Sequence, residues 1–315
     1  MKLYKLTSIL LFLSLITISM SCTSSDEEGK NFSNLLNTLK TETGIIGDIY
    51  NESINSLRNG VTVHDIDFES EGERTHMFIA QIDLNQVTII ASTPNDKPEL
   101  ANPDAILPVH AGSAEGNGKT VWVGVNGDYW AENSSVPGGL VPMGIFYKDG
   151  VAIRTTYYNQ HTEVIYKTKS GDIGIGTVND IFPQLDNMQE VIGGRGLLIK
   201  DDVQQTVFDD ISQSTIRYPR TAVGINKKNN TLYFLVVDGR QQGYSSGLDL
   251  NAIASLLHSL NCTNAIALDG GGSSTMIVRK VKPDGLVTFP IINRPSDNDG
   301  ARTISNGILV IEKQQ

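Results

Sequence analysis

Carboxylates, arginines and glycines gather in this chain at the ends of predicted strands, where sheet proteins commonly build binding and catalytic sites. We call these strand ends, with the loops that adjoin them, polar corners. The most distinctive polar corner is "ALDGGGSST", in which Asp269 follows an apolar run and leads into Gly270, Gly271, Gly272 and then Ser273. Three consecutive glycines are conformationally costly, so either the loop moves or something approaches its backbone closely. Because apolar strand-like residues flank the loop on both sides, the sequence favours close approach.

Similar polar corners follow or precede other predicted strands. They supply carboxylates, guanidinium groups, amides and a hydroxyl from Asn126, Asp128, Arg195, Arg220, Thr221, Asp238, Arg240, Asn293, Arg294 and Arg302. Any one of them has an ordinary explanation, because Asp-Gly and Asn-Gly pairs form turns and surface arginines pair with carboxylates. Together, glycine N–H groups that can form an anion-binding nest and arginines that bind phosphate through paired donors predict a local anion site.

Other catalytic schemes fit the sequence poorly. The glycine loop lacks both the Gly-Lys-Ser/Thr of a P-loop and the glycine spacing of a dinucleotide fingerprint. "GYSSG" around Ser245 resembles a hydrolase nucleophile elbow, but it lies too far beyond its strand and no suitable histidine follows. Cys262, with His258 four residues before it, is more typical of a buried apolar residue than of a thiol nucleophile. No HExxH or CxxC pattern occurs, so no metal or other cofactor is expected, with a divalent cation at Asp297 and Asp299 as the alternative.

The elements that would position these corners are mostly short strands. Apolar alternation and short apolar runs predict strands at 61–69, 75–84, 86–93, 120–125, 196–202, 221–237, 265–268, 275–280 and 306–313, with a hairpin at 143–153. One clear helix is predicted over 250–260, with Asp249 as its cap. Residues 30–57 have a loose helical spacing and predict a helical lead on the surface. We therefore expect a single strand-rich domain over 58–315, of the mixed α/β (α+β) class, with a mixed sheet and few helices.

Composition excludes several classes of protein. The 315 residues are 39% hydrophobic and 19% charged, which is compatible with a packed core, and the net charge is −10. An acidic chain has no electrostatic footprint for nucleic acid, so nucleic acid is excluded as a partner. No run of 18 apolar residues follows the first two dozen residues, so no internal membrane span is expected. The sequence makes no prediction of oligomeric state.

The N-terminus has the pattern of an export signal. Lys2 and Lys5 precede an apolar stretch over 9–18, and small residues lead to Cys22. This pattern resembles a bacterial lipoprotein signal, with residues 1–21 as the signal peptide and lipidation at Cys22. The polar, acidic segment 22–29 is typical of a tether. We expect an exported protein that a lipid anchor holds at the outer membrane, exposed at the cell surface, with a plain signal peptide and an incidental cysteine as the alternative.

Several of these segments, in this order, resemble the phosphodiester glycosidase family. They are "NGDYW", "IGGRGLLI", "RTAVGI", the run from "VVDGRQQGYSSG" through "LDGGGSSTMIV", and "NRPSDNDGARTISNGILV". The resemblance implies hydrolysis of a sugar-1-phosphodiester on a glycan, which frees the sugar and leaves a phosphomonoester. A phosphorylated glycan is therefore the expected partner.

The resemblance also implies which residues carry the chemistry. Asp238 and Asp269 are the candidate catalytic carboxylates, with Asp128 third, acting as nucleophile or base at the anomeric carbon. Arginines and backbone N–H groups would hold the charge of the leaving phosphate. The residues implied in substrate binding are Asn126, Arg195, Arg220, Thr221, Arg240, Gly270, Gly271, Gly272, Ser273, Asn293 and Arg294.

The chain departs from the family pattern at one position. Many relatives carry Glu where this sequence has Ala252. This favours one alternative, a surface lipoprotein that binds glycans without cleaving them. A second alternative is a metal-dependent phosphodiesterase, which would cut on the phosphorus side of the linkage rather than on the sugar side.

Overall fold

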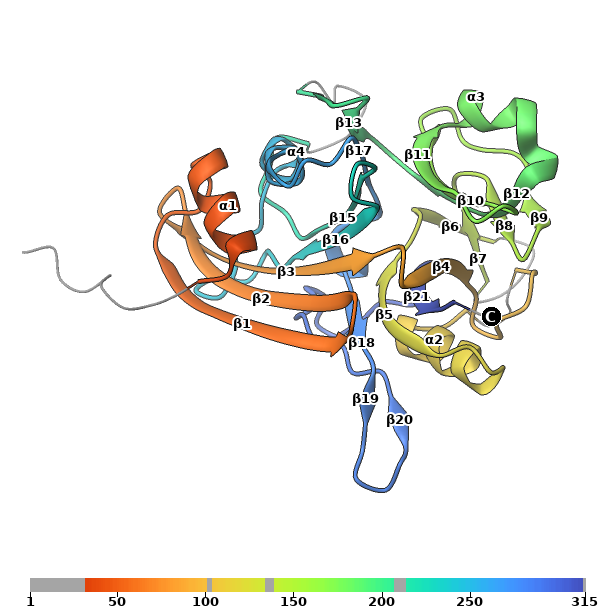
Figure 1. Ribbon diagram of the computed structural model, residues 1–315, viewed down its shortest axis with the longest axis horizontal. Coiled ribbons are helices and arrows are strands. Elements are labelled where there is room, and N and C mark those ends of the chain that lie inside the picture. The colour runs from red at the N-terminus through yellow and green to blue at the C-terminus, as the bar shows by residue number, and fades with distance from the viewer. Residues whose placement is uncertain (1–31, 101–103, 134–138, 207–213, 314–315) are drawn as a thin grey trace, which may run out of the picture. The chain divides into compact units, whose positions relative to one another are not determined.

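Strands make up most of the protein, whose computed structural model describes residues 32–100, 104–133, 139–206 and 214–313 (Figure 1). They lie in three larger sheets and two short hairpins, and every strand pairing in these ranges is antiparallel. The strand-rich α+β class that the sequence predicts is confirmed. The sheets differ from the expected mixed sheet in that no parallel pair joins the described strands.

The three larger sheets contain eight, five and four strands. The eight-stranded sheet has the order β1 (Ile49–Arg58), β2 (Val61–Ser70), β3 (Glu73–Asp83), β16 (Thr231–Val237), β15 (Arg220–Asn226), β17 (Asn264–Ala267), β13 (Leu197–Lys200) and β14 (Val203–Gln204). The five-stranded sheet has the order β11 (Ile173–Thr177), β10 (Glu163–Thr168), β12 (Met188–Gly194), β8 (Phe146–Lys148) and β9 (Val151–Arg154). The four-stranded sheet has the order β18 (Met276–Val278), β5 (Val121–Asn126), β21 (Gly307–Glu312) and β4 (Val87–Ser92).

The remaining elements are short. Two hairpins pair β6 (Trp130–Glu132) with β7 (Leu140–Pro142) and β19 (Lys280–Val281) with β20 (Val287–Thr288). The helices are α1 (Asn34–Thr43), α2 (Leu107–Gly116), α3 (Val178–Ile181) and α4 (Leu250–Ser259), with 3₁₀ turns η1 (Phe182–Asn187) and η2 (Gly271–Ser273). None of the helices among the described residues has the length and apolar character needed to cross a membrane.

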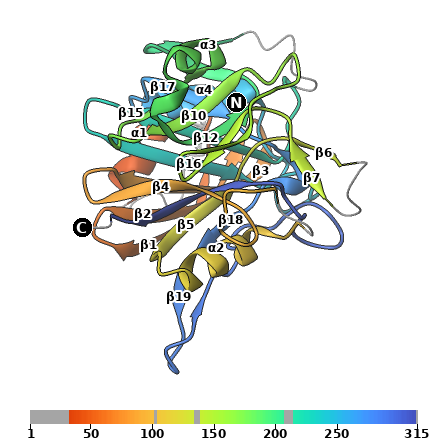
Figure 2. The ribbon, with the colours of Figure 1, turned by 90° about the vertical axis from the view of Figure 1, so that its right-hand side faces the viewer.

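Side chains from all three larger sheets share one hydrophobic core. Figure 2 shows strands of the three sheets, among them β16, β12 and β4, in the same part of the molecule. Phe78 and Phe234 come from the eight-stranded sheet, Phe146 from the five-stranded sheet and Val125 from the four-stranded sheet, and all four are buried. Each such side chain contributes about 1.5–3 kcal/mol when it leaves water. The shared core holds the sheets against one another, and it thereby fixes the ends of the strands from which the polar loops leave.

The helix α4 covers one part of the eight-stranded sheet, and its apolar stripe explains why. Leu250, Ile253 and Leu257 recur at helical spacing and are buried. Gly224 in β15 makes room for this packing, because a Cβ there would lie 2.7 Å from the Cys262 sulfur and 3.1 Å from a Leu257 methyl group. Cys262 is buried and burial raises the pKa of its thiol, so it is a core residue as predicted.

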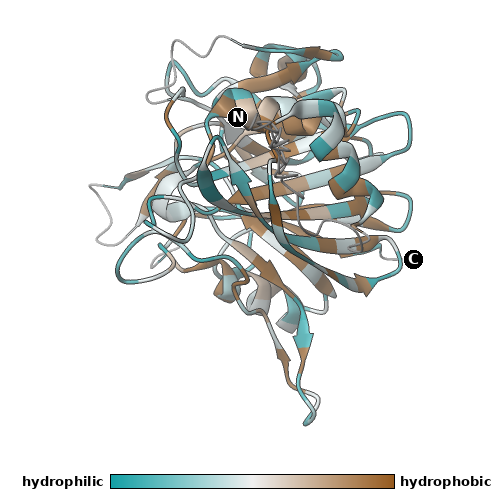
Figure 3. Ribbon diagram, turned by 90° about the vertical axis from the view of Figure 1, so that its left-hand side faces the viewer, coloured by the Kyte–Doolittle hydropathy of each residue, from teal (hydrophilic) through white to brown (hydrophobic). Residues whose placement is uncertain are grey.

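The N-terminal part differs from the predicted helical lead. In the part of this segment that the structure describes, from residue 32, helix is confined to Asn34–Thr43, and residues 49–58 form β1, which pairs along its length with β2. Helix α1 and strand β1 belong to the compact unit that runs from Ser33 onward, so no boundary separates them from the region after residue 58. Tyr50 and Ile54 of β1 are about half exposed, and hydrophobic and hydrophilic stretches both occur along the strands on this side (Figure 3). The proposed signal peptide, Cys22 and the tether lie outside the described residues.

Candidate active site

Antiparallel pairing brings several of the predicted polar corners to one end of the eight-stranded sheet. Arg220 at the start of β15 pairs with Val237 at the end of β16, and Ala222 pairs with Ala267 at the end of β17. The segments that follow, which carry Asp238 and Asp269, therefore leave the sheet at the same end as Arg220. Strand β5 of the four-stranded sheet also ends at this place, next to Asp269.

Backbone hydrogen bonds hold the glycine loop against its neighbours. The Asp269 N–H donates to the Gly127 carbonyl at 3.1 Å, and the Gly271 N–H donates to the Pro219 carbonyl at 2.9 Å. One residue earlier, the Leu268 N–H donates to the Thr221 carbonyl at 2.9 Å. The loop is thus tied to two segments that precede it by more than forty residues, which is typical of a fixed loop rather than a moving one.

Each glycine of the loop has its own steric cause. A Cβ at Gly270 would lie 2.9 Å from the Pro219 carbonyl oxygen. Gly271 has a φ of +62° and a Cβ there would lie 3.2 Å from Nη1 of Arg240. A Cβ at Gly272 would collide with the Asp297 carboxylate. The close approach that the sequence favours is therefore what the structure contains.

Asn126, at the end of β5, joins three parts of the site. Its amide nitrogen donates to the backbone carbonyl of Asp269 at 2.7 Å. Its amide oxygen accepts from the Thr221 hydroxyl at 2.8 Å and from the Thr275 N–H at 3.1 Å. Asn126 and Thr221 are both buried and their polar groups are engaged with one another. This geometry gives them a framework role, and the contacts with substrate hydroxyls stay a prediction.

Asp269 and Asp128 form an electrostatically coupled pair of carboxyl groups. Burial raises the pKa of Asp269 to about 6, against the opposing effects of the Ser273 hydroxyl and the Arg302 guanidinium. Burial also raises the pKa of Asp128 to about 7, and the charge of Asp269 adds to that shift. Asp128 is only 1% exposed, whereas Asp269 is half-buried. Of the three predicted carboxylates, Asp269 is therefore the one that a ligand can reach.

Asp238 is enclosed by its own hydrogen bonds. Its Oδ1 accepts from the Asn293 amide at 2.9 Å, and its Oδ2 accepts from the Arg294 N–H at 2.8 Å and the Tyr244 hydroxyl at 3.0 Å. The residue is 1% exposed. Asn293 also donates to the Ser274 carbonyl and accepts from the Met276 N–H. Through these contacts Asp238 and Asn293 hold the loop that follows the glycine segment, and the catalytic and substrate-binding roles expected of them stay predictions.

"GYSSG" closes over Asp238 from the other side. The Ser245 hydroxyl donates to the Asp238 carbonyl at 2.6 Å and accepts from the His76 N–H at 3.0 Å. Ser245 is 1% exposed and both functions of its hydroxyl are used. The motif is a structural clamp, in agreement with the weak case for a serine nucleophile.

The predicted arginines fall into two groups. Arg220 is buried, and its guanidinium donates to the carbonyls of Leu248 and Ile216 at 3.3 and 2.9 Å. Arg240 and Arg294 are exposed and each lies over a tyrosine ring, with 4.1 and 5.2 Å from the guanidinium carbon to the ring centroid. Arg195 is half-buried and donates to the Gln160 side chain at 2.5 Å. Arg240, Arg294 and Arg195 are consequently the ones placed to meet an anion.

A cavity of about 560 Å³ opens beside the glycine loop. Arg240, Asn293, Arg294 and Asp297 are among the residues that line it. Arg240 and Asp297 are also the neighbours that crowd Gly271 and Gly272, so the cavity and the loop share a wall. Asp297 forms an ion pair with Arg302 at 2.7 Å, which differs from the cation site considered for it from the sequence.

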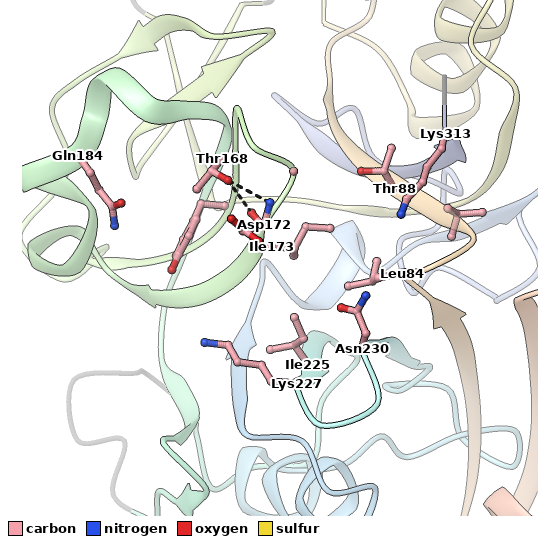
Figure 4. Close-up of a pocket in the computed structure, with 13 residues that line it drawn as sticks. Leu84, Thr88, Thr168, Asp172, Ile173, Gln184, Ile225, Lys227, Asn230 and Lys313 are labelled. Atoms are coloured by element: carbon pink, nitrogen blue, oxygen red, sulfur yellow. Dashed lines mark hydrogen bonds between the residues drawn. The ribbon is translucent and has the colours of Figure 1, made fainter. Parts of the chain in front are cut away.

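A second cavity, of about 520 Å³, lies elsewhere (Figure 4). Leu84, Lys227, Asn230 and Lys313 are on its wall together with residues of the β10–β11 hairpin, and none of the predicted site residues lines it. Within the described ranges, no group of three or more His, Cys, Asp or Glu side chains is arranged to hold a metal ion.

Sequence patterns missed two aromatic residues of the site, Tyr129 and His161. Their rings meet edge to face, with centroids 5.2 Å apart, and Nδ1 of His161 lies 3.9 Å from Oδ1 of Asp128. Tyr129 belongs to the "NGDYW" motif, which could have drawn attention to it. His161 follows no motif and is separated from Asp128 by more than thirty residues, so only the fold reveals it.

Ala252 occupies the third position of α4, and its N–H donates to the carboxylate of the N-cap Asp249 at 2.8 Å. An N-cap acceptor followed three residues later by Glu is the capping-box pattern. The Glu that many relatives carry here therefore suits helix capping, and its replacement by Ala is not in itself a sign of lost chemistry.

Comparison with known proteins identifies relatives of this chain. The chain is 31% identical over 166 residues to the SPbeta prophage-derived uncharacterized protein YomE of Bacillus subtilis (strain 168), a match that covers 50% of this chain and 24% of that protein. The chain thus spans about a quarter of the length of that relative.

Solved structures share the fold. The catalytic domain of zebrafish N-acetylglucosamine-1-phosphodiester alpha-N-acetylglucosaminidase, auto-inhibited by its pro-peptide, is 20% identical with a TM-score of 0.56, covering 84% of this chain and 88% of that one. A hypothetical protein from Synechocystis is 14% identical with a TM-score of 0.57, covering 84% and 64%. The phosphodiester glycosidase profile matches residues 119–311. Because this match covers more than half of the sequence, the chain belongs to the phosphodiester glycosidase family.

Proposed function

We propose that the protein hydrolyses a sugar-1-phosphodiester on a glycan, breaking the bond between the anomeric carbon and the phosphate oxygen. The observation that carries the proposal is the position of Asp269, the most exposed of the three candidate carboxylates, at the start of a glycine loop that lies against the guanidinium of Arg240. Family membership supports the reaction class, and the zebrafish enzyme of known structure is named for this activity on N-acetylglucosamine.

One reachable carboxylate suits this linkage for a chemical reason. Ordinary glycosidases use two carboxyl groups, one of which protonates a poor leaving group. A phosphate leaves as a stable anion and needs charge stabilisation more than a proton. Arg240, whose guanidinium lies against Gly271, can supply that stabilisation. Asp128 and Asp238 are too deeply buried to serve as the second carboxyl group.

The proposed reaction runs as follows. Asp269 acts on the anomeric side, as the nucleophile or as the base that activates water. The bond between carbon and oxygen breaks, and its electron pair stays with the phosphate oxygen. The sugar leaves with the oxygen of water, and the phosphate remains on the rest of the glycan as a phosphomonoester. Burial raises the pKa of Asp269 to about 6. The carboxylate is therefore still ionised at neutral pH, and it is a stronger base than an ordinary aspartate.

The cavity beside the glycine loop suits the part of the substrate beyond the phosphate. Arg240 and Arg294 are exposed on its wall, and stacking on tyrosine rings restrains both guanidinium groups. A restrained cation loses less conformational entropy when it binds an anion. We therefore assign the phosphate, together with the part of the glycan that keeps it, to this cavity. The leaving sugar is assigned to the side of Asp269.

Turnover by matched variants tests this function. The substrates are methyl phosphodiesters of glucose, N-acetylglucosamine and mannose linked through the anomeric oxygen, with sugar release as the readout. We expect wild type to release at least one sugar and Asp269→Asn to reduce the rate by at least about a thousandfold. Asp284→Asn, in an exposed turn, should behave as wild type. Absence of release by wild type from the whole panel contradicts the function and favours the non-catalytic glycan-binding alternative.

We also propose that the protein is exported and lipid-anchored at the outer membrane through Cys22. The order of positive charges, apolar stretch and cysteine in the first 22 residues supports this. Metabolic labelling with a fatty acid should mark the full-length protein in a bacterial host and should not mark Cys22→Ala. Equal labelling of Cys22→Ala would contradict the anchor.

A further inference from the structure

Tyr129 occupies a fixed position next to Asp269. The turn that carries it touches the glycine loop, because the Asp269 N–H donates to the Gly127 carbonyl at 3.1 Å. The turn is also held from the other side, where the Met143 N–H donates to the Tyr129 carbonyl at 2.8 Å. The backbone of Tyr129 is thus anchored on both sides, while its side chain is half-buried rather than enclosed.

The ring of Tyr129 is oriented by the group beneath it. His161 is 4% exposed and meets the ring edge to face, at an angle of 68° between the ring planes. His161 in turn lies against Asp128, whose Oδ2 accepts from the Gly144 N–H at 2.6 Å. Such an arrangement leaves the aromatic ring few alternative orientations, and an aromatic surface with a fixed orientation is well suited to pack against a sugar.

The phenol lies within electrostatic reach of Asp269 and of two guanidinium groups. Asp269 acts on it from the anomeric side, and the guanidinium groups of Arg220 and Arg195 act on it with the opposite sign. Burial and Asp269 raise the pKa of Tyr129 above its ordinary value, so the hydroxyl keeps its proton throughout the physiological range. A neutral phenol is a donor that can approach a negatively charged phosphate without repulsion.

We propose that Tyr129 contacts the substrate, with its ring forming one wall of the subsite for the leaving sugar and its hydroxyl donating a hydrogen bond to the phosphate oxygen released from that sugar. The assignment rests on the proposed function, because it requires a sugar and a phosphate on either side of the phenol. His161 is then a positioning residue that acts through the Tyr129 ring.

Two substitutions at position 129 separate the two roles. Tyr129→Phe keeps the ring and removes the donor, and a hydrogen bond to a charged oxygen that strengthens as the bond breaks should cost about 10- to 100-fold in kcat with little change in KM. Tyr129→Ala should in addition raise KM about tenfold or more. His161→Gln should reduce kcat less than Tyr129→Phe and should not add to it in the double variant. Tyr166→Phe, on the wall of the remote cavity of Figure 4, is the matched control and should behave as wild type.

A binding measurement keeps this proposal distinguishable from the proposed function. The probes are non-hydrolysable phosphonate analogues of the same sugar-1-phosphodiesters, followed by calorimetry. Tyr129→Ala should weaken the binding of the best probe about tenfold, whether or not turnover is detected. If wild type turns over substrate but Tyr129→Phe and Tyr129→Ala match it in kcat, KM and probe affinity, Tyr129 has no contact and the inference is overturned while the function stands. If wild type neither binds a probe nor turns over a substrate, both are overturned.

Discussion

The side chain of Asn126 donates a hydrogen bond of 2.7 Å to the backbone carbonyl of Asp269, and so joins the end of β5 to the start of the glycine loop. Asn126 ends a strand of the four-stranded sheet, whereas Asp269 follows β17 of the eight-stranded sheet, and more than 140 positions separate the two in the sequence. The amide of Asn126 thus fixes where the Asp269 carboxylate stands relative to the rest of the site.

Replacing Asn126 by Ala should therefore affect both stability and activity. The change leaves the Asp269 carbonyl and the Thr275 N–H without their partner in a buried place, which should cost about 2–4 kcal/mol in the free energy of unfolding. Turnover should fall more than a hundredfold, since a misplaced reacting group loses its orientation. Chemical denaturation and sugar release measure the two effects. Asn55→Ala on the exposed strand β1 is the control, and equal behaviour of the two variants would contradict the assignment.

Much of this arrangement follows from sequence patterns, and the rest depends on distant partners. The strands and the loop around Asp269 are visible because apolar periodicity and consecutive glycines are local signals. The hydrogen bonds that enclose Asp238 cannot be predicted from local sequence patterns, because the groups that donate them come from positions 244, 293 and 294. Strand β1 was missed for a similar reason: its side chains are largely exposed, so apolar alternation is weak, and pairing with β2 decides its structure.

The glycine loop provides a second prediction, based on a collision. Gly272→Ala places a methyl group against the Asp297 carboxylate, so the loop must shift, and we expect sugar release to fall at least tenfold with a loss of about 1–3 kcal/mol in stability. Truncating the neighbour in the double variant Gly272→Ala/Asp297→Ala should restore part of both losses.

Gly112→Ala is the matched control for this experiment. Gly112 lies within α2 with open space around its Cβ position, so this change should raise stability by about 0.5–1 kcal/mol and leave turnover unaltered. Strictly additive losses in the Gly272/Asp297 cycle would show that the collision is not the cause.

The raised pKa of Asp128 predicts a specific dependence of stability on pH. The folded protein binds this proton up to about pH 7, whereas the unfolded chain releases it near the ordinary value of 3.8. Between these limits the native state holds more protons than the unfolded state, so this group's contribution to stability is full at low pH and is lost as pH rises towards 7. A shift of about three units corresponds to roughly 4 kcal/mol.

Asp128→Asn should abolish that contribution. Because other buried acids titrate in the same range, the quantity to follow is the difference between wild type and Asp128→Asn in the free energy of unfolding, measured by denaturation at intervals from pH 4 to 8. We expect wild type to lose stability relative to the variant as pH rises. A difference that stays constant with pH, or that changes with the opposite sign, would show that Asp128 does not hold its proton in the folded state.

Ala252→Glu tests whether the departure from the family pattern concerns the helix or the chemistry. If the glutamate serves to complete a capping box with Asp249, the variant should gain about 0.5–1 kcal/mol in stability while its turnover stays within a factor of two. Thermal unfolding and sugar release are the readouts, and Ala254→Glu is not a suitable comparison because Ala254 is buried. An increase in rate of tenfold or more would instead identify position 252 as part of the catalytic group.

The position of the cleaved bond tests the central claim most directly. Hydrolysis of the best sugar-1-phosphodiester in water enriched in oxygen-18, followed by mass spectrometry of both products, shows which atom accepts the solvent oxygen. Cleavage on the sugar side by Asp269 predicts that the label enters the released sugar and that Asp269→Asn forms no labelled product above background. Label in the phosphomonoester would contradict this account, because it would mean attack at phosphorus, as in a phosphodiesterase.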